Sequence, residues 1–249
     1  MRRLLLGLLL VAAGLAGCAT PQRPDPLEPW NRKVFAFNEG LDKAVLKPTA
    51  TAYQKVVPGP VRTAATNFFN NIYDLWSATN LFLQGRVTDG LSDVMRFGSN
   101  TVFGILGLAD VASEMGMERH NEDFGQTLGH WGVGPGAYIV WPVLGSSTVR
   151  DSVALPIELQ ITPESLVSPV RASNSLMGLR VINTRANLLQ AGNVLDGIAL
   201  DKYTFMRDAY LQRRRSLVYD GDPPPLDEEP DEPVPENKSP GKDSDKSIK

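Results

Sequence analysis

A segment rich in glycine and aromatic residues, between Asp123 and Gly145, is the first place to look for chemistry. Its sequence, DFGQTLGHWGVGPGAYIVWPVLG, also holds one of the two histidines of the chain. Glycine loses more conformational freedom on folding than any other residue, so repeated glycines need a physical reason. Three are available: a loop that cradles phosphate, a turn that presents a catalytic serine, or backbone that packs closely.

A nucleotide-binding loop does not fit the spacing of these glycines. The dinucleotide fingerprint is G-x-G-x-x-G between a strand and a helix, whereas Gly132, Gly134 and Gly136 follow a G-x-G-x-G pattern that contains Pro135. The phosphate loop of nucleoside triphosphatases ends in Gly-Lys-Ser/Thr, and this ending does not occur in the sequence. We therefore expect no nucleotide and no other cofactor.

The sequence offers few side chains that could bind a metal or catalyse hydrolysis. The chain has two histidines, His120 and His130, and one cysteine, whereas a zinc site needs three or four ligands at matched spacing. We expect no metal, and a loop or surface position for His120. A lipase-like enzyme would need Ser146 or Ser147 beside His130, and this alternative stays open because catalytic triads form in space.

Close backbone packing beside an apolar phase is the third explanation of the glycines. Small residues let helices approach each other, and aromatic rings suit a boundary between lipid and water. Ten of the 22 glycines lie between Gly98 and Gly145. A tightly turned loop on a soluble core would use the same residues, so the composition of the segment leaves both explanations open.

The segment that precedes the glycines is unusually apolar. Val102 to Met117, VFGILGLADVASEMGM, contains only Asp110 and Glu114 as charged residues. Such a stretch is either buried core of a helical protein, which we expect first from the residues alone, or an element in the bilayer interface.

The elements that position these segments are predicted to be helices. Apolar residues recur every three or four positions through most of the chain, and no stretch alternates as a strand would. Asp25 is expected to cap the first helix and Thr148 a later one. The periodic region 172–216 is expected to divide near Asn193 and Gly197. The predicted fold class is mainly α.

The two ends of the chain predict export and a polar tail. Two arginines, a short apolar run and small residues before Cys18 are typical of a signal peptide, residues 1–17. The cut before a cysteine resembles the bacterial lipoprotein signal, which implies that Cys18 carries the lipid anchor. Residues 221–249 are rich in proline and acidic residues, and we expect a disordered tail there.

The body between these ends, predicted as a single domain over residues 18–220, carries no net charge. Ala19 to Asp220 holds 19 basic and 19 acidic residues, although the whole chain has a net charge of −3. A neutral body argues against nucleic acid as a partner, because binding to phosphates requires a basic surface.

Three segments together resemble the MlaA/VacJ lipoproteins of the Gram-negative system that maintains outer-membrane lipid asymmetry. They are DPLEPWNRKVFAFN (25–38), NTVFGILGLADVA (100–112) and DFGQTLGHWGVGPGAYIVWPVLGSSTVRD (123–151). The resemblance runs in the same order from about Cys18 to Ser216 and leaves out the tail.

The resemblance implies a single helical, ring-shaped domain embedded in the inner leaflet of the outer membrane, lipid-anchored on the periplasmic side. Ala19, in place of an aspartate, implies sorting to that membrane. The implied function is a non-enzymatic channel that removes mislocalised phospholipids from the outer leaflet. The implied partners are phospholipids, a trimeric outer-membrane porin and a periplasmic phospholipid carrier that returns the lipids to the inner membrane.

The two unusual segments supply the residues expected to line the channel or to lie in the membrane. They are Val102, Phe103, Ile105, Leu106, Leu108, Gly125, Gly129, Trp131, Gly132, Gly134, Gly136 and Tyr138. A structural tether between the membrane and periplasmic partners is a further alternative, in which the tail or Arg213 to Arg215 would carry the function.

Overall fold

The computed structural model describes residues 25–225. The predicted signal peptide, Cys18 and all but the first five residues of the predicted tail lie outside the described residues, so their assignments stay predictions. The described part confirms the mainly α-helical fold class.

The helices and strands follow one another along the chain with short connections. They are α2 (Glu28–Leu41), η1 (Asp42–Leu46), α3 (Lys47–Val56), α4 (Gly59–Leu83), α5 (Val87–Val102), α6 (Val111–Glu114), α7 (Phe124–His130), β1 (Tyr138–Trp141), β2 (Gly145–Thr148), α8 (Val149–Glu158), η2 (Pro163–Leu166), α9 (Val170–Asn187), α10 (Leu189–Ile198) and α11 (Lys202–Val218).

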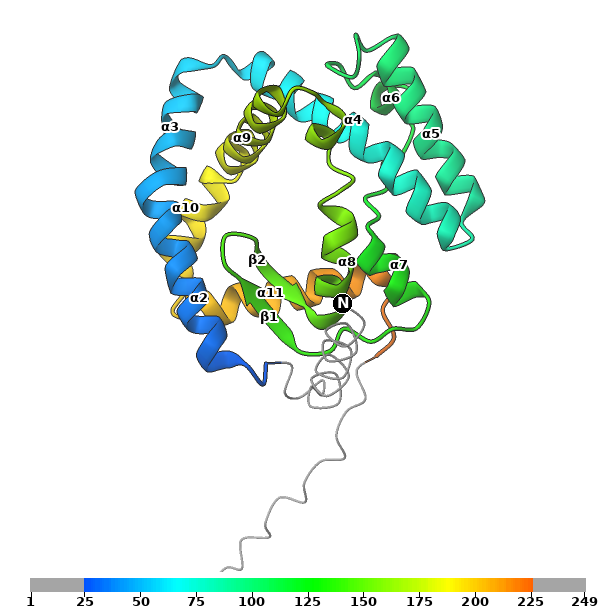
Figure 1. Cartoon of the computed structure of the whole chain (residues 1–249). Helices are drawn as coiled ribbons and strands as arrows, with labels where there is room; N and C mark the ends of the chain where they lie inside the picture. Colours follow the sequence, from blue (N-terminus) through cyan, green and yellow to red (C-terminus); the bar gives the residue numbers. More distant parts are fainter. Residues whose placement is uncertain (1–24, 226–249) are drawn as a thin grey trace, which may run out of the picture.

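The elements are arranged as a ring, with one helical hairpin projecting from it (Figure 1). The long helix formed by α2, the π-helical turn η1 and α3 makes one side, and α9 and α10 lie beside it. Helix α11 runs along the opposite edge from the start of α4, behind the β1–β2 hairpin in this view. Helices α4 and α5 pack against each other and carry α6 away from the ring.

The local signals for helix ends were partly correct. Thr148 caps α8 as predicted, because its side chain accepts a hydrogen bond from the Asp151 amide. Asp25 is not a cap: α2 starts at Glu28, and the Asp25 carboxylate binds Asn31 instead. The last helical region divides at Leu188 and again at residues 199–201, since Asp201 caps α11. The predicted division near Asn193 was therefore wrong, whereas the one near Gly197 is confirmed, because α10 ends at Ile198.

The expectation of no strands was also wrong. Strands β1 and β2 form an antiparallel hairpin in which Tyr138 pairs with Thr148 and Trp141 with Gly145. Each strand has only four residues, too few for a period of two to stand out in the sequence. Val143, in the turn between the two strands, has a positive φ of 68°.

Two asparagines on one face of α2 take the place of a third strand. Asn31 donates to the carbonyl of Tyr138 (2.9 Å) and accepts from the amide of Val140 (2.8 Å). Asn38, seven residues later, does the same with the carbonyl of Trp141 (3.0 Å) and the amide of Val143 (2.8 Å). The free edge of β1 is thereby satisfied by side chains, and α2 is joined to the hairpin.

Ion pairs tie the long α2–η1–α3 helix to the last three helices. The pairs are Arg32–Asp201, Glu39–Lys202, Asp42–Arg185 and Lys47–Asp196. The guanidinium of Arg185 lies 2.6 Å from Asp42 and holds the pKa of that carboxyl below its usual value, mainly through their hydrogen bond. Partly exposed ion pairs each add little to stability. These four pairs therefore mainly set the positions of the helices relative to one another.

We expect Asn31→Ala to destabilise the protein much more than Asn38→Ala. Asn31 has no exposed surface. Its loss leaves the buried carbonyl of Tyr138 and the buried amide of Val140 without hydrogen-bond partners, which we expect to lower the free energy of unfolding by about 2–3 kcal/mol. Asn38 lies in more open surroundings, where water replaces the lost bonds. Denaturant unfolding of the two variants in detergent measures the difference, and equal losses would contradict the role given to Asn31.

Candidate functional site

Helix α4 of the α4–α5 hairpin buries polar and apolar side chains, whereas α5 buries its polar side chains and exposes most of its large apolar ones. On α5 the buried residues are Gly90, Asp93, Arg96 and Asn100. The large apolar residues of the same helix face outward: Val87, Leu91, Val94, Met95 and Val102. A surface helix of a soluble protein shows the opposite arrangement, with an apolar stripe toward the core.

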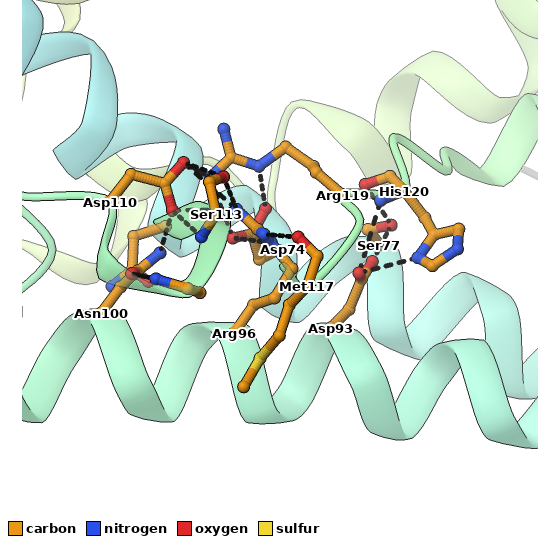
Figure 2. Close-up of polar contacts among 12 residues, drawn as sticks. Asp74, Ser77, Asp93, Arg96, Asn100, Asp110, Ser113, Met117, Arg119 and His120 are labelled. Carbon is orange, nitrogen blue, oxygen red and sulfur yellow. Dashed lines mark hydrogen bonds and ion pairs between the residues drawn. The ribbon is translucent and has the colours of Figure 1, made fainter. Parts of the chain in front are cut away.

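Arg96 is the centre of the polar interior (Figure 2). Its side chain has no exposed surface and lies between two carboxylates, 3.0 Å from Asp110 and 3.6 Å from Asp74. It also donates to the carbonyl of Met117. Arg119 adds a second cation, 2.9 Å from Asp74. The network links α4, α5 and the segment around α6, which follow one another in the sequence.

A second polar cluster lies beside it and contains the first histidine. The Ser77 hydroxyl donates to Asp93 (2.6 Å), and the ring of His120 lies 3.0 Å from the other oxygen of the same carboxylate (Figure 2). A Ser-His-Asp catalytic triad has the histidine between serine and carboxylate, whereas here the carboxylate is in the middle. His120 lies on the loop between α6 and α7, as expected, and its partly buried ring makes a structural contact there.

The polar interior holds an exposed apolar loop in a fixed shape. Residues 103–109 connect α5 to α6, and Ile105, Leu106 and Gly107 all have positive φ. A side chain at Gly104 would lie 2.2 Å from the carbonyl oxygen of Ala109, so only glycine fits there. Asp110 ends the loop, caps α6 and binds Arg96.

The side chains of this loop face outward. Phe103 and Ile105 are each 71% exposed and Leu106 is 68% exposed, with Val102 and Leu108 exposed on either side. The expectation of a buried core for this segment was therefore wrong. Two large residues in the left-handed region cost about 1–3 kcal/mol each, so the surrounding hydrogen bonds must hold them there.

Two glycines of the second segment allow close packing against charged side chains. On α7, a Cβ at Gly125 would lie 2.6 Å from Asp151, and one at Gly129 would lie 2.7 Å from Arg150. Gly136 has a φ of 66° and lies against Val149. The other two glycines of the predicted set are Gly132 and Gly134, and a Cβ added to either of them would meet no atom within 4 Å.

The charges beneath α7 form one compact cluster. Arg214 of α11 binds both Asp123 and Asp151, the latter at 2.9 Å. Tyr210 donates to Asp151 as well, at 2.9 Å. Burial alone would raise the pKa of Asp151, but the charges of Arg214 and Arg150 outweigh it and hold that pKa below its usual value. Asp151 thus stays ionised and joins α7, α8 and α11.

The two aromatic residues of the predicted set lie in different surroundings. Trp131 is half exposed, donates to the carbonyl of Leu83 and meets Phe124 edge to face. Tyr138 has no exposed surface and packs in a core cluster with Tyr203 and Val140. Because its side chain is enclosed by protein, we do not retain Tyr138 among the candidates for contact with lipid.

The serines of the enzyme alternative are engaged elsewhere. Ser146 bonds to the Tyr138 hydroxyl at 2.8 Å, and Ser147 to Ser152 at 3.0 Å. Within residues 25–225, no hydrogen bond joins either serine to His130, and no group of His, Cys, Asp or Glu could hold a metal. None of the helices described is long and apolar enough to cross a membrane.

Several residues that organise the site were not singled out from the sequence, notably Asp74 and Arg96, and Arg214 was considered only within Arg213 to Arg215 of the tether alternative. Their signal was present in part: Asp93, Arg96 and Asn100 recur at three- and four-residue spacing, which marks one face of a helix. A polar face usually meets solvent, so this spacing did not point to the interior.

We expect Arg96→Met to destabilise the protein by about 3–5 kcal/mol, because it leaves two carboxylates in the hairpin without their central cation. Arg171→Met is the matched control, since Arg171 is exposed and has no ion pair among the described residues; there we expect a change within about 0.5 kcal/mol. Thermal unfolding in detergent compares the two. Similar midpoints would show that Arg96 is not central to the hairpin.

The comparisons with known proteins agree on one family. A family model described as MlaA lipoprotein matches residues 23–217. A protein of Escherichia coli (strain K12), named intermembrane phospholipid transport system lipoprotein MlaA, is 34% identical over 219 residues, which are 86% of each chain. An uncharacterized protein of Rickettsia prowazekii is 41% identical over 195 residues, 78% of each chain.

A solved structure has the same fold. It is described as "Structural basis for maintenance of bacterial outer membrane lipid asymmetry" and matches with a TM-score of 0.69 and 36% sequence identity. The match covers 79% of this chain and all of the other. The extent of these matches shows that the chain belongs to the MlaA lipoprotein family.

Proposed function

We propose that this protein is the outer-membrane lipoprotein of a phospholipid transport system that maintains lipid asymmetry. It would lie in the inner leaflet of the outer membrane, anchored through Cys18. There it would remove mislocalised phospholipids from the outer leaflet and pass them to a periplasmic carrier. Relatives in Escherichia coli and Shigella flexneri carry the name of an intermembrane phospholipid transport system, which supports this general role.

The observation that carries the proposal is the reversed burial of the α4–α5 hairpin. Its interior satisfies charged groups with one another, and its outer face is apolar. In hydrocarbon, unpaired charges are costly and polar side chains turn toward the protein interior. An apolar exterior of this extent on a soluble monomer would instead favour association. A lipid leaflet is the surrounding that fits both features.

The exposed loop extends this apolar surface. Phe103, Ile105 and Leu106 continue the outer face of α5 beyond its last turn. Trp131, half exposed with its indole N–H bonded to protein, suits the headgroup level, where amphipathic rings concentrate. The channel, the neighbouring trimeric porin and the carrier come from the family resemblance and are part of the proposal.

The enzyme and tether alternatives have less support. Ser146 and Ser147 bond to side chains other than His130, so a lipase would need a different arrangement. A tether would depend on the tail or on Arg213 to Arg215, where Arg215 bonds to the carbonyl of Pro224. Hydrolysis of phospholipid that is lost in His130→Ala would favour the enzyme, and loss of function on deleting residues 221–249 would favour the tether.

Aspartates in the apolar loop should weaken membrane binding that does not depend on the anchor. We would make Ile105→Asp and Leu106→Asp together in a Cys18→Ala background. A charge placed in hydrocarbon costs on the order of 2.5–3.5 kcal/mol, so we expect partitioning into vesicles to fall more than tenfold. Gln190→Asp together with Asn193→Asp, which adds the same two charges at exposed polar positions of α10, is the control. Unchanged partitioning of the loop variant would argue against insertion of the loop.

Deleting the gene should raise the phospholipid content of the cell surface. Wild type is expected to restore the normal level, whereas Cys18→Ala, which cannot be acylated, should not. Surface phospholipid is measured by labelling intact cells. If deletion leaves it unchanged, the transport role is wrong and the enzyme and tether alternatives gain support.

A further inference from the structure

A cavity of about 260 Å³ lies where the first turn of α4 meets the end of α9. It is separate from the α4–α5 hairpin and from the glycine-rich segment. Its lining residues are Gly59, Arg62, Thr63, Thr66 and Asn187. Helices α4 and α9, which supply these residues, pack against each other, and α3 packs against α9 (Figure 1).

Arg62 is the only charged residue of this lining, and its charge is not neutralised nearby. No carboxylate lies within 4 Å of its guanidinium among the described residues. Its Nε atom is buried and has no hydrogen-bond partner. Arg96, Arg185 and Arg214, by contrast, each bind a carboxylate. A buried N–H without a partner costs free energy, so Arg62 is suited to a ligand that accepts hydrogen bonds.

The wall of the cavity is held in place by neutral hydrogen bonds. The Thr66 hydroxyl donates to the carbonyl of Arg62 (3.1 Å) and accepts from the amides of Asn183 (2.8 Å) and Asn187 (3.0 Å). Asn183 in turn accepts from the hydroxyl of Tyr53 at 3.0 Å. These bonds fix Arg62 and Asn187 relative to each other without adding a negative charge.

The first turn of α4 adds to the positive charge around the cavity. Helix α4 has 25 residues, and its first turn has no side-chain cap, so the positive end of its dipole remains open. The negative end of α9 is occupied: Leu188 donates to the carbonyls of Thr184 and Arg185, and Gln54 to that of Ala186. The positive end of the α4 dipole and the guanidinium of Arg62 therefore both favour an anion in the cavity.

From this arrangement we infer that the cavity, named here the Arg62 pocket, binds a phosphate group. A guanidinium fork matches phosphate oxygens with two parallel N–H bonds, and the exposed Thr63 hydroxyl supplies a further donor. The phosphate belongs either to a phospholipid headgroup or to free inorganic phosphate. The headgroup case rests on the proposed function and would give the transported lipid a polar binding site within the ring.

Calorimetry on the full chain in neutral detergent tests the pocket. The probes are inorganic phosphate and dihexanoylphosphatidylglycerol below its micelle concentration, with uncharged dihexanoylglycerol as the blank. We expect one site per chain for a phosphate-bearing probe and at least tenfold weaker binding in Arg62→Gln. Thr63→Val should weaken it several-fold. Arg171→Gln, which removes an exposed, unpaired cation elsewhere on α9, should bind as wild type does.

The two sources of phosphate give different results. Binding of the lipid but not of inorganic phosphate assigns a headgroup site, and the reverse assigns a site for the free anion. The inference is overturned if neither probe saturates, or if Arg62→Gln binds as tightly as wild type. Surface phospholipid in cells tests the proposed function separately: if gene deletion leaves it unchanged, the transport role fails while calorimetry still decides the pocket.

Discussion

The need to neutralise Arg96 inside a helical hairpin constrains much of this structure. A guanidinium without exposed surface is tolerated only where carboxylates and carbonyls surround it. Asp74 comes from α4, Asp110 from the start of α6 and the Met117 carbonyl from beyond α6. Satisfying one side chain therefore brings three segments together and fixes both ends of the loop 103–109.

That constraint also explains how an apolar loop can be exposed and yet ordered. Ile105 and Leu106 adopt backbone angles that large side chains avoid, and an isolated loop would relax from them. Here the amides of Leu106 and Gly107 donate to carbonyls at the end of α5, and Asp110 closes the loop. The hairpin keeps its polar bonds inside and leaves apolar side chains on its surface, the arrangement that the proposed location in a lipid leaflet requires.

The sequence predicted the helices, the Thr148 cap and the apolar segments, because these depend on periodicity and local hydrogen bonding. It did not predict which face of α5 is buried. Asp93, Arg96 and Asn100 form a polar stripe that is typical of a solvated face, and only their partners on other elements reveal an interior. The short strands were missed for a related reason, since the edge of β1 is completed by Asn31 and Asn38 of α2, far away in sequence.

Contacts with residues distant in sequence also explain a glycine of the glycine-rich segment. Arg214 of α11 must reach Asp123 and Asp151 at the same time, and the backbone of α7 crosses directly over this cluster. A Cβ at Gly125 would lie 2.8 Å from the Arg214 guanidinium as well as 2.6 Å from Asp151, so any side chain there would separate the charges. A buried cation that loses a carboxylate partner is strongly destabilising. Glycine at this position is thus required by an ion cluster, not by a nucleotide phosphate or a catalytic turn.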